Sequence, residues 1–427
     1  MQKDQYGNPL TTSLVKARDA YVRGLECNLA AAPGAEEAFQ EAVAEDENFA
    51  LAHLAIARNR QVEGRGVSGR EPYAAAKACA EGLSPREQGH LAIIGSLLEG
   101  KSEGVYEKAR AHLQEFPRDV MIAQACLGVF SLIGFGGQPG REAENLALSS
   151  MLAPHYGDDW WFLSTHAFSQ MEAGQLEPAA QSIERSLAIN PRNANGSHHR
   201  AHLYYEVGET AAGLAYLKDW IEGYDSQGVM HCHLSWHIAL WALAEGDVKT
   251  MWEVADTAID PKTSSGPALN IVTDMPALLY RAELAGVEVA PDRWQSISDY
   301  ATARFAKPRL GFADVHAALA HAMAGNAEGV ATIVENANGP AEDLVRGLAQ
   351  AFQAFAKQNW QLTTEHLTKA MSDHARIGGS RAQRDLIELA MAGALARQGK
   401  SDEAAMLLNC RRPLALGAAV QTISNEH

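Results

Sequence analysis

Three histidines, one cysteine and two tryptophans lie within the twelve residues 230–241, MHCHLSWHIALW. In this segment His233 and His237 are four residues apart, and His198 and His202 show the same spacing further back. Residues four apart lie one turn apart on the same face of a helix, so their imidazole nitrogens can reach one metal ion. The spacing predicts a ligand or metal site, with zinc, iron or manganese as the metals to consider.

The four histidines are expected to share one face. The angular position of each histidine on its helix can be counted back from the turn glycine of its own helix pair. Measured in this way, the four positions span an arc of about 100°. His166 points about 140° away from His233 and is expected to lie elsewhere. A single helical histidine is usually a core residue bonded to a carbonyl, but two pairs on one face favour a shared site. Trp236 is a candidate ligand contact, with packing between helices as the alternative, and Cys232 is expected to be a core thiol.

Two distant segments carry further candidates for the same site. ADVHAAL contains Asp314 and His316, and an aspartate beside a histidine can orient the imidazole as a base or a metal ligand. GSRAQRD contains Gln383, Arg384 and Asp385, of which the arginine offers a planar fork for a carboxylate or phosphate. The alternative for the Arg-Asp pair is a salt bridge within a helix or between repeats.

The elements that position these residues follow one repeated helical pattern. In THAFSQMEAGQLEPAAQSIERSLAINPRNA, Gly174 marks a tight turn between two helices, and the next such glycine, Gly208, lies 34 residues later. That distance is the period of tetratricopeptide repeats. Similar turns are expected at Gly246, Gly325 and Gly399, and runs of valine and isoleucine that would indicate strands are scarce.

Helix pairs of this kind cannot bury their apolar faces alone, so they stack on their neighbours. The sequence therefore predicts an all-α fold, a tetratricopeptide-like α-solenoid that forms a right-handed superhelix. It is expected to be one domain over residues 1–427, with an N-terminal helical cap at 1–29, degenerate repeats at 30–411 and a C-terminal tail at 412–427. The glycine-rich segment 134–141 and the segment 260–267 are expected to be loops between helices.

Composition excludes several classes of protein. The chain has 427 residues, of which 47% are hydrophobic and 21% charged, so it can bury a large core and is not disordered. Its formal net charge of -16 provides no cationic surface for nucleic acid or anionic membranes, and neither is expected as a partner. Without a signal peptide or a long apolar run, the protein is expected to be cytoplasmic. Five widely separated cysteines are expected to be reduced.

The segment SPREQ, which begins at Ser84, is typical of the first turn of a helix. Glu87 complements the helix dipole there, and capping together with exposure to solvent is sufficient to explain Arg86 and Glu87. The motifs of serine hydrolases, P-loop proteins and zinc proteases are absent from the sequence.

Several segments together resemble the tetratricopeptide repeat protein 38 family. They are SPREQGHL (84–91), HHRAHLYYEVG (198–208), MHCHLSWHIALW (230–241), ADVHAAL (313–319) and GGSRAQRD (378–385), and they occur in the family's order with similar spacing. The resemblance covers nearly the whole chain and implies an α-solenoid of tetratricopeptide-like repeats. It implies no activity.

Three classes of function agree with these observations. The first is a concave or enclosed histidine-rich pocket that binds a peptide or a small anionic molecule. The second is an enzyme that uses the same cluster for acid-base or metal-assisted hydrolysis. The third is an interaction scaffold in which the histidines have no chemical role. A second copy of the chain is a candidate partner in each class. If the pocket exists, these side chains should converge although they come from separate repeats.

Overall fold

The computed structural model describes residues 2–101 and 103–410, so the predicted tail at 412–427 lies outside the described residues. The chain is 70% helical and almost without strands, which confirms the prediction of an all-α fold. Among the described helices, none is both long and apolar enough to cross a membrane.

The described chain divides into two compact units, each with its own hydrophobic core. Unit 1 comprises the residues up to 133 together with 142–199 and 227–230. Unit 2 comprises 134–141, 200–226 and the residues from 231 onward. The boundary falls inside a helix, after His199, so this helix contributes residues to both units.

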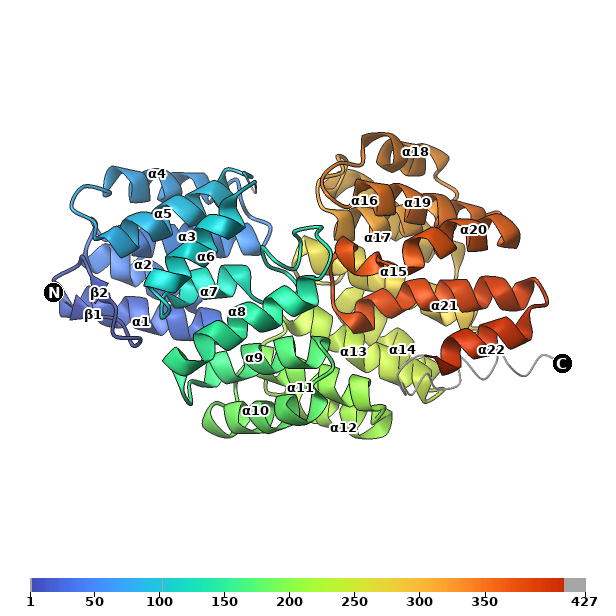
Figure 1. The fold of residues 1–427 in the computed structure, drawn as a ribbon, viewed down its shortest axis with the longest axis horizontal. Helices are drawn as coiled ribbons and strands as arrows, with labels where there is room; N and C mark the ends of the chain where they lie inside the picture. Colours follow the sequence, from blue (N-terminus) through green and yellow to red (C-terminus); the bar gives the residue numbers. More distant parts are fainter. Residues whose placement is uncertain (1, 102, 411–427) are drawn as a thin grey trace. The chain divides into compact units, whose positions relative to one another are not determined.

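Unit 1 begins with a short antiparallel hairpin and continues as stacked helices, among which α1 packs on α2 and α9 packs on α10 (Figure 1). Its elements are β1 (Gln2–Lys3), β2 (Pro9–Leu10), α1 (Val15–Ala30), α2 (Ala35–Glu45), α3 (Ala50–Val62), α4 (Arg70–Ala78), α5 (Pro85–Leu98), α6 (Val105–Glu115), α7 (Val120–Cys126), α8 (Arg141–Tyr156), α9 (Trp160–Glu172) and α10 (Leu176–Ile189).

The shared helix is α11 (Ala194–Val207), which enters unit 2. The other elements of unit 2 are α12 (Thr210–Ile221), α13 (His231–Ala244), α14 (Val248–Val254), the π-helix η1 (Ala255–Ile259), α15 (Ala268–Leu284), α16 (Pro291–Arg304), α17 (Gly311–Met323), α18 (Ala327–Asn336), α19 (Glu342–Ala356), α20 (Trp360–Met371), the 3-10 helix η2 (His374–Ile377), α21 (Arg381–Arg397) and α22 (Ser401–Asn409). The predicted loop at 260–267 lies between helices, and so does the predicted loop at 134–141 except for Arg141, which begins α8.

All five turn glycines predicted from the sequence lie between paired helices. They have φ angles from 74° to 86°, the left-handed region that glycine adopts without a steric penalty: Gly174, Gly208, Gly246, Gly325 and Gly399. The turn between α19 and α20 has no glycine, and Gln358 adopts the left-handed conformation there at φ 55°.

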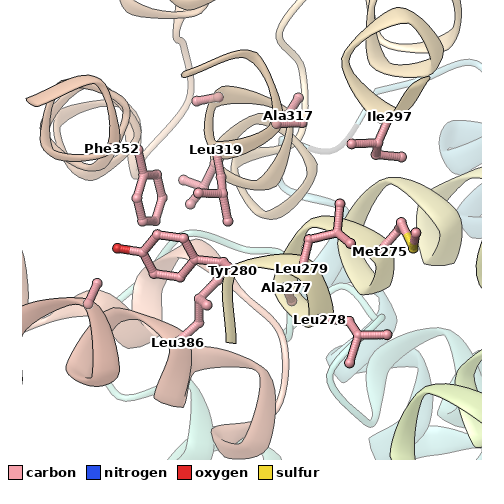
Figure 2. Packing of buried hydrophobic residues seen from close by; sticks show 14 of the residues in the cluster. Met275, Ala277, Leu278, Leu279, Tyr280, Ile297, Ala317, Leu319, Phe352 and Leu386 are labelled. Carbon is pink, nitrogen blue, oxygen red and sulfur yellow. The ribbon is translucent and has the colours of Figure 1, made fainter. Parts of the chain in front are cut away.

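The core of unit 2 is built around α15, which packs against α13, α16, α17 and α21. Figure 2 shows the Tyr280 ring between Phe352 and Leu386, while Met275 and Leu279 lie on the side of α15 that faces α16 and α17. Because most of α15 is buried, its polar side chains are also enclosed by protein.

Helix α13 is apolar on every side, and each residue from Cys232 to Leu243 is buried. This explains why His233 and His237 are buried although histidine is usually found at intermediate exposure. Burial raises the pKa of the Cys232 thiol, so Cys232 is a protonated core thiol at neutral pH, as expected.

Within unit 1, the start of α5 is hydrogen bonded to the end of the N-terminal hairpin and the residue that follows it. Ser84 and Glu87 form a capping box, as the sequence suggests. The expected exposure to solvent is wrong, because Glu87 is only 1% exposed and Arg86 is also buried. Glu87 accepts hydrogen bonds from the backbone N–H and the hydroxyl of Thr11, and Arg86 donates to the carbonyl of Pro9 at 3.0 Å.

Asp119 is the centre of a buried ion cluster beside this hairpin. Its carboxylate contacts Arg86 Nη1 at 3.2 Å, His90 Nδ1 at 3.0 Å and His112 Nε2 at 2.9 Å. Gly89 is required by the close approach of His112, since an added Cβ would lie 2.5 Å from His112 Nδ1. The SPREQGHL segment therefore has a structural role in unit 1.

Candidate functional site: a buried histidine cluster

The structure brings four of the predicted histidines together. One nitrogen from each of His198, His202, His233 and His237 can be chosen so that all four atoms lie within 4.8 Å of one another. His198 packs with unit 1, but its position relative to His202 is set by helix α11, on which both stand one turn apart. All four side chains are buried.

The three histidines of unit 2 form the centre of the cluster. The ring centroids of His202 and His237 are 4.7 Å apart, and those of His233 and His237 are 5.0 Å apart. Both pairs meet at angles near a right angle, 80° and 77°. Imidazoles this close in a buried site have to remain neutral, share protons or bind a cation.

A carboxylate orients one member of the cluster. Asp274 on α15 accepts a hydrogen bond from His233 Nδ1 at 2.8 Å, and both side chains are buried. This bond places a proton on Nδ1, so a neutral His233 has its lone pair on Nε2, the arrangement found where a histidine ligates a metal through Nε2.

Trp236 covers one side of the cluster. Its indole is fully buried and stacks on the His233 ring at 5.2 Å and 14°. The Arg281 guanidinium lies 6.0 Å from the centre of the Trp236 ring. Trp236 thus packs directly against the histidines, and this contact does not require a ligand.

The expected Asp314–His316 pair does not form. Asp314 accepts hydrogen bonds from the backbone N–H groups of Leu310 at 3.0 Å and Arg309 at 3.4 Å, at the start of α17, and burial raises its pKa to about 7. His316 Nδ1 instead donates to the Phe312 carbonyl at 2.7 Å. Neighbours on one helix two residues apart point in different directions, which explains the failure of this prediction.

His316 is close enough to Asp274 for the charge of that carboxylate to act on its pKa. Burial lowers its pKa to about 4, and the charges of Asp274 and Arg281 act on it in opposite directions. It is therefore neutral at pH 7, and Nε2, a buried atom without a hydrogen-bond partner, holds its lone pair.

A second polar group lies where α21 begins. Arg281 Nη2 donates to the Ala382 carbonyl at 2.6 Å, and Nη1 donates to the Tyr205 hydroxyl at 3.4 Å. That hydroxyl donates to Asp385 Oδ2 at 2.9 Å. Asp385 is thus tied to α11 through Tyr205.

The remaining residues of GGSRAQRD shape the same helix start. Gly379 has φ 76°, and an added Cβ would lie 2.3 Å from the Phe312 ring. Its carbonyl accepts hydrogen bonds from Arg384 Nη1 at 3.0 Å and from Arg141. Gln383 closes a capping box with Ser380, whose backbone N–H donates to Gln383 Oε1 at 2.9 Å.

No known protein-family model matches this sequence. Solved structures of other proteins resemble the chain over most of its length at low identity. Human IFIT1, solved as a dimer with m7Gppp-AAAA, is 12% identical, covers 99% of this chain and 98% of its own, and has a TM-score of 0.45. Yeast Tom70 is 12% identical, covers 95% of this chain and 86% of its own, and has a TM-score of 0.38.

The described residues form an all-α fold of successive helix pairs. The predicted tetratricopeptide-like α-solenoid is thus confirmed. The helix pairs with left-handed turn residues are the local basis of this architecture.

The predicted exclusion of nucleic acid is wrong. IFIT1, which spans the same length of chain, was solved with m7Gppp-AAAA and with PPP-AAAA. The exclusion of membranes used the same charge argument and is withdrawn with it.

Two residues at the site were not among the predicted candidates. Asp274 and Arg281 are seven residues apart, two turns along α15, and both are buried in a mostly apolar segment. An isolated acidic or basic residue in a buried helix is unusual and requires a partner. The charged residues within the apolar sequence ALNIVTDMPALLYRAEL could therefore have indicated that Asp274 and Arg281 belong to a buried polar site.

Proposed function

We propose that this protein binds one divalent transition-metal ion through the histidine cluster of α11 and α13. The observation that supports the proposal most strongly is the convergence of four buried imidazoles from two helices. Imidazole nitrogen suits zinc and iron better than manganese, which prefers oxygen ligands. The Asp274–His233 bond adds the carboxylate partner that metal-bound histidines usually have.

Binding is favoured over metal-assisted hydrolysis. A catalytic zinc site usually has three protein ligands and an open position, whereas four protein ligands close the site. His316, a buried base on α17, has a pKa of about 4 and accepts protons poorly at pH 7. Asp314 has a pKa of about 7, but its oxygens accept from backbone N–H groups.

The ligand proposed here is thus a metal cation, which differs from the peptide or small anionic molecule expected from the sequence. We also propose membership of the tetratricopeptide repeat protein 38 family. Its support is the ordered set of segments quoted above, four of which contribute residues to the buried polar groups of unit 2.

The test is the metal content and zinc affinity of the tag-free full chain. We expect the native protein to hold about one ion per chain, and a variant with both His202→Ala and His237→Ala to lose it, because two ligands are removed from a four-ligand site. Elemental mass spectrometry and competition with a chromogenic zinc chelator measure both quantities.

His321→Ala is the matched control. His321 is also buried in unit 2, but its Nδ1 is hydrogen bonded to Ser298 Oγ at 2.8 Å, outside the cluster. This variant should keep the metal. Equal zinc affinity in the native protein and the double variant would refute the proposal, as would a native protein that takes up no metal from zinc, iron or manganese solutions.

A further inference from the structure

The first turn of α21 has a charge pattern opposite to that of a typical helix start. It contains Arg381 and Arg384 and no acidic residue. Cations near a helix N-terminus are unfavourable because the helix dipole is positive there. Arg381 lies 3.9 Å from Glu206. The guanidiniums of Arg141 and Arg281 add further positive charge at the same place, through their bonds to the carbonyls of Gly379 and Ala382.

Two buried donors at this helix start have no hydrogen-bond partner. Gln383 is 2% exposed, and its Oε1 is used in the capping box, which leaves the Nε2 amide with two N–H groups and no acceptor. Arg281 is 6% exposed, and its Nε is likewise without an acceptor. A buried donor without an acceptor costs about 1–3 kcal/mol, so such groups usually have a ligand or water as their partner.

We propose that the N-terminus of α21 binds a phosphate group, with Gln383 Nε2 and Arg281 Nε as donors. A helix N-terminus and guanidinium groups both favour a tetrahedral oxyanion. None of these donors is a proposed metal ligand, so the phosphate site does not depend on the histidine cluster.

The identity of residue 383 separates this proposal from a purely structural role. A capping box accepts glutamate at this position as well as glutamine, and glutamate also complements the helix dipole. Only glutamine supplies an N–H donor after its oxygen has bonded to Ser380. Gln383→Glu should therefore keep or improve the cap and remove the donor.

The experiment is calorimetric titration of inorganic phosphate into the full chain after its metal has been removed with a chelator. We expect the native protein to bind phosphate and Gln383→Glu to bind it at least about tenfold more weakly, since a donor is replaced by a negative charge. The melting temperature of Gln383→Glu should equal or exceed that of the native protein. Gln361→Glu, an exposed change on α20, controls for the added charge and should bind like the native protein.

Arg281→Lys gives a second measurement, because lysine keeps the positive charge and removes Nε. It should also weaken phosphate binding. The proposal fails if the native protein binds no phosphate at millimolar concentration, or if Gln383→Glu binds phosphate as tightly as the native protein. The titration uses metal-free protein, so a native protein that binds no phosphate does not contradict the metal proposal. Loss of metal binding in the histidine variant likewise does not contradict the phosphate proposal.

Discussion

Asp119→Ala is expected to destabilise unit 1 by about 3–5 kcal/mol, the usual cost of removing one partner of a buried ion cluster. Asp119 is 2% exposed and contacts Arg86, His90 and His112. Without the carboxylate, the Arg86 guanidinium is left in a buried site with no ionised partner at 3.2 Å. Urea unfolding, followed by hydrogen exchange of the amides of unit 1, measures the loss in the free energy of unfolding.

Asp256→Ala is the control for this prediction. Asp256 pairs with Arg293 at the surface, with half of its side chain exposed, and its loss should change stability by less than about 0.5 kcal/mol. An Asp119→Ala protein as stable as Asp256→Ala would show that the cluster contributes little to the fold.

The same cluster predicts sensitivity to acid. Burial alone would raise the pKa of Asp119, but the charge of His90, hydrogen bonds from His112 and His90, and the charge of Arg86 hold it well below its usual range. A depressed folded-state pKa means that the carboxylate stabilises the fold above its unfolded value of about 3.9, and that this stability is lost as the pH falls below it. Asp119→Asn should therefore show a weaker loss of stability below about pH 4 than the native protein.

Asp274→Asn is expected to lower the zinc affinity of the histidine cluster about 10–100-fold, the usual effect of removing the carboxylate behind a metal-bound histidine. Asparagine keeps the size of the side chain and removes the charge that polarises His233. Competition with a zinc chelator measures the change.

Asp314→Asn is the matched control, because Asp314 bonds to backbone N–H groups and to no histidine of the cluster. It should bind zinc within about twofold of the native protein. An Asp274→Asn protein with unchanged affinity, or an equal loss in both variants, would contradict the role assigned to Asp274.

The repeat architecture was predictable because it depends on local signals. The five glycine turns and the apolar periodicity each lie within one helix pair, and all five turns formed. Turns without glycine were not predictable in this way, as Gln358 shows. The shared face of the histidines also follows from helical geometry, since their spacing is local.

The partners of the histidines could not be predicted, because they come from long-range packing. Asp274 is 41 residues from His233, and Thr11 is 76 residues from Glu87. Proximity in the sequence favoured Asp314 as the partner of His316. In the fold, the carboxylate that bonds to a histidine of the cluster is Asp274 of α15, which contacts His233. The interpretation of Glu87 as solvated failed for the same reason, since the hairpin that covers it is distant in sequence.

X-ray absorption at the metal edge of zinc-loaded, tag-free protein tests the central claim most directly. Binding by the cluster predicts a shell of nitrogen neighbours at about 2.0–2.1 Å with the scattering pattern of three or four imidazoles. Four imidazoles would indicate a closed binding site, and three with an oxygen would indicate an open position. A sulfur shell at about 2.3 Å, or oxygen neighbours alone, would place the metal elsewhere and contradict the account.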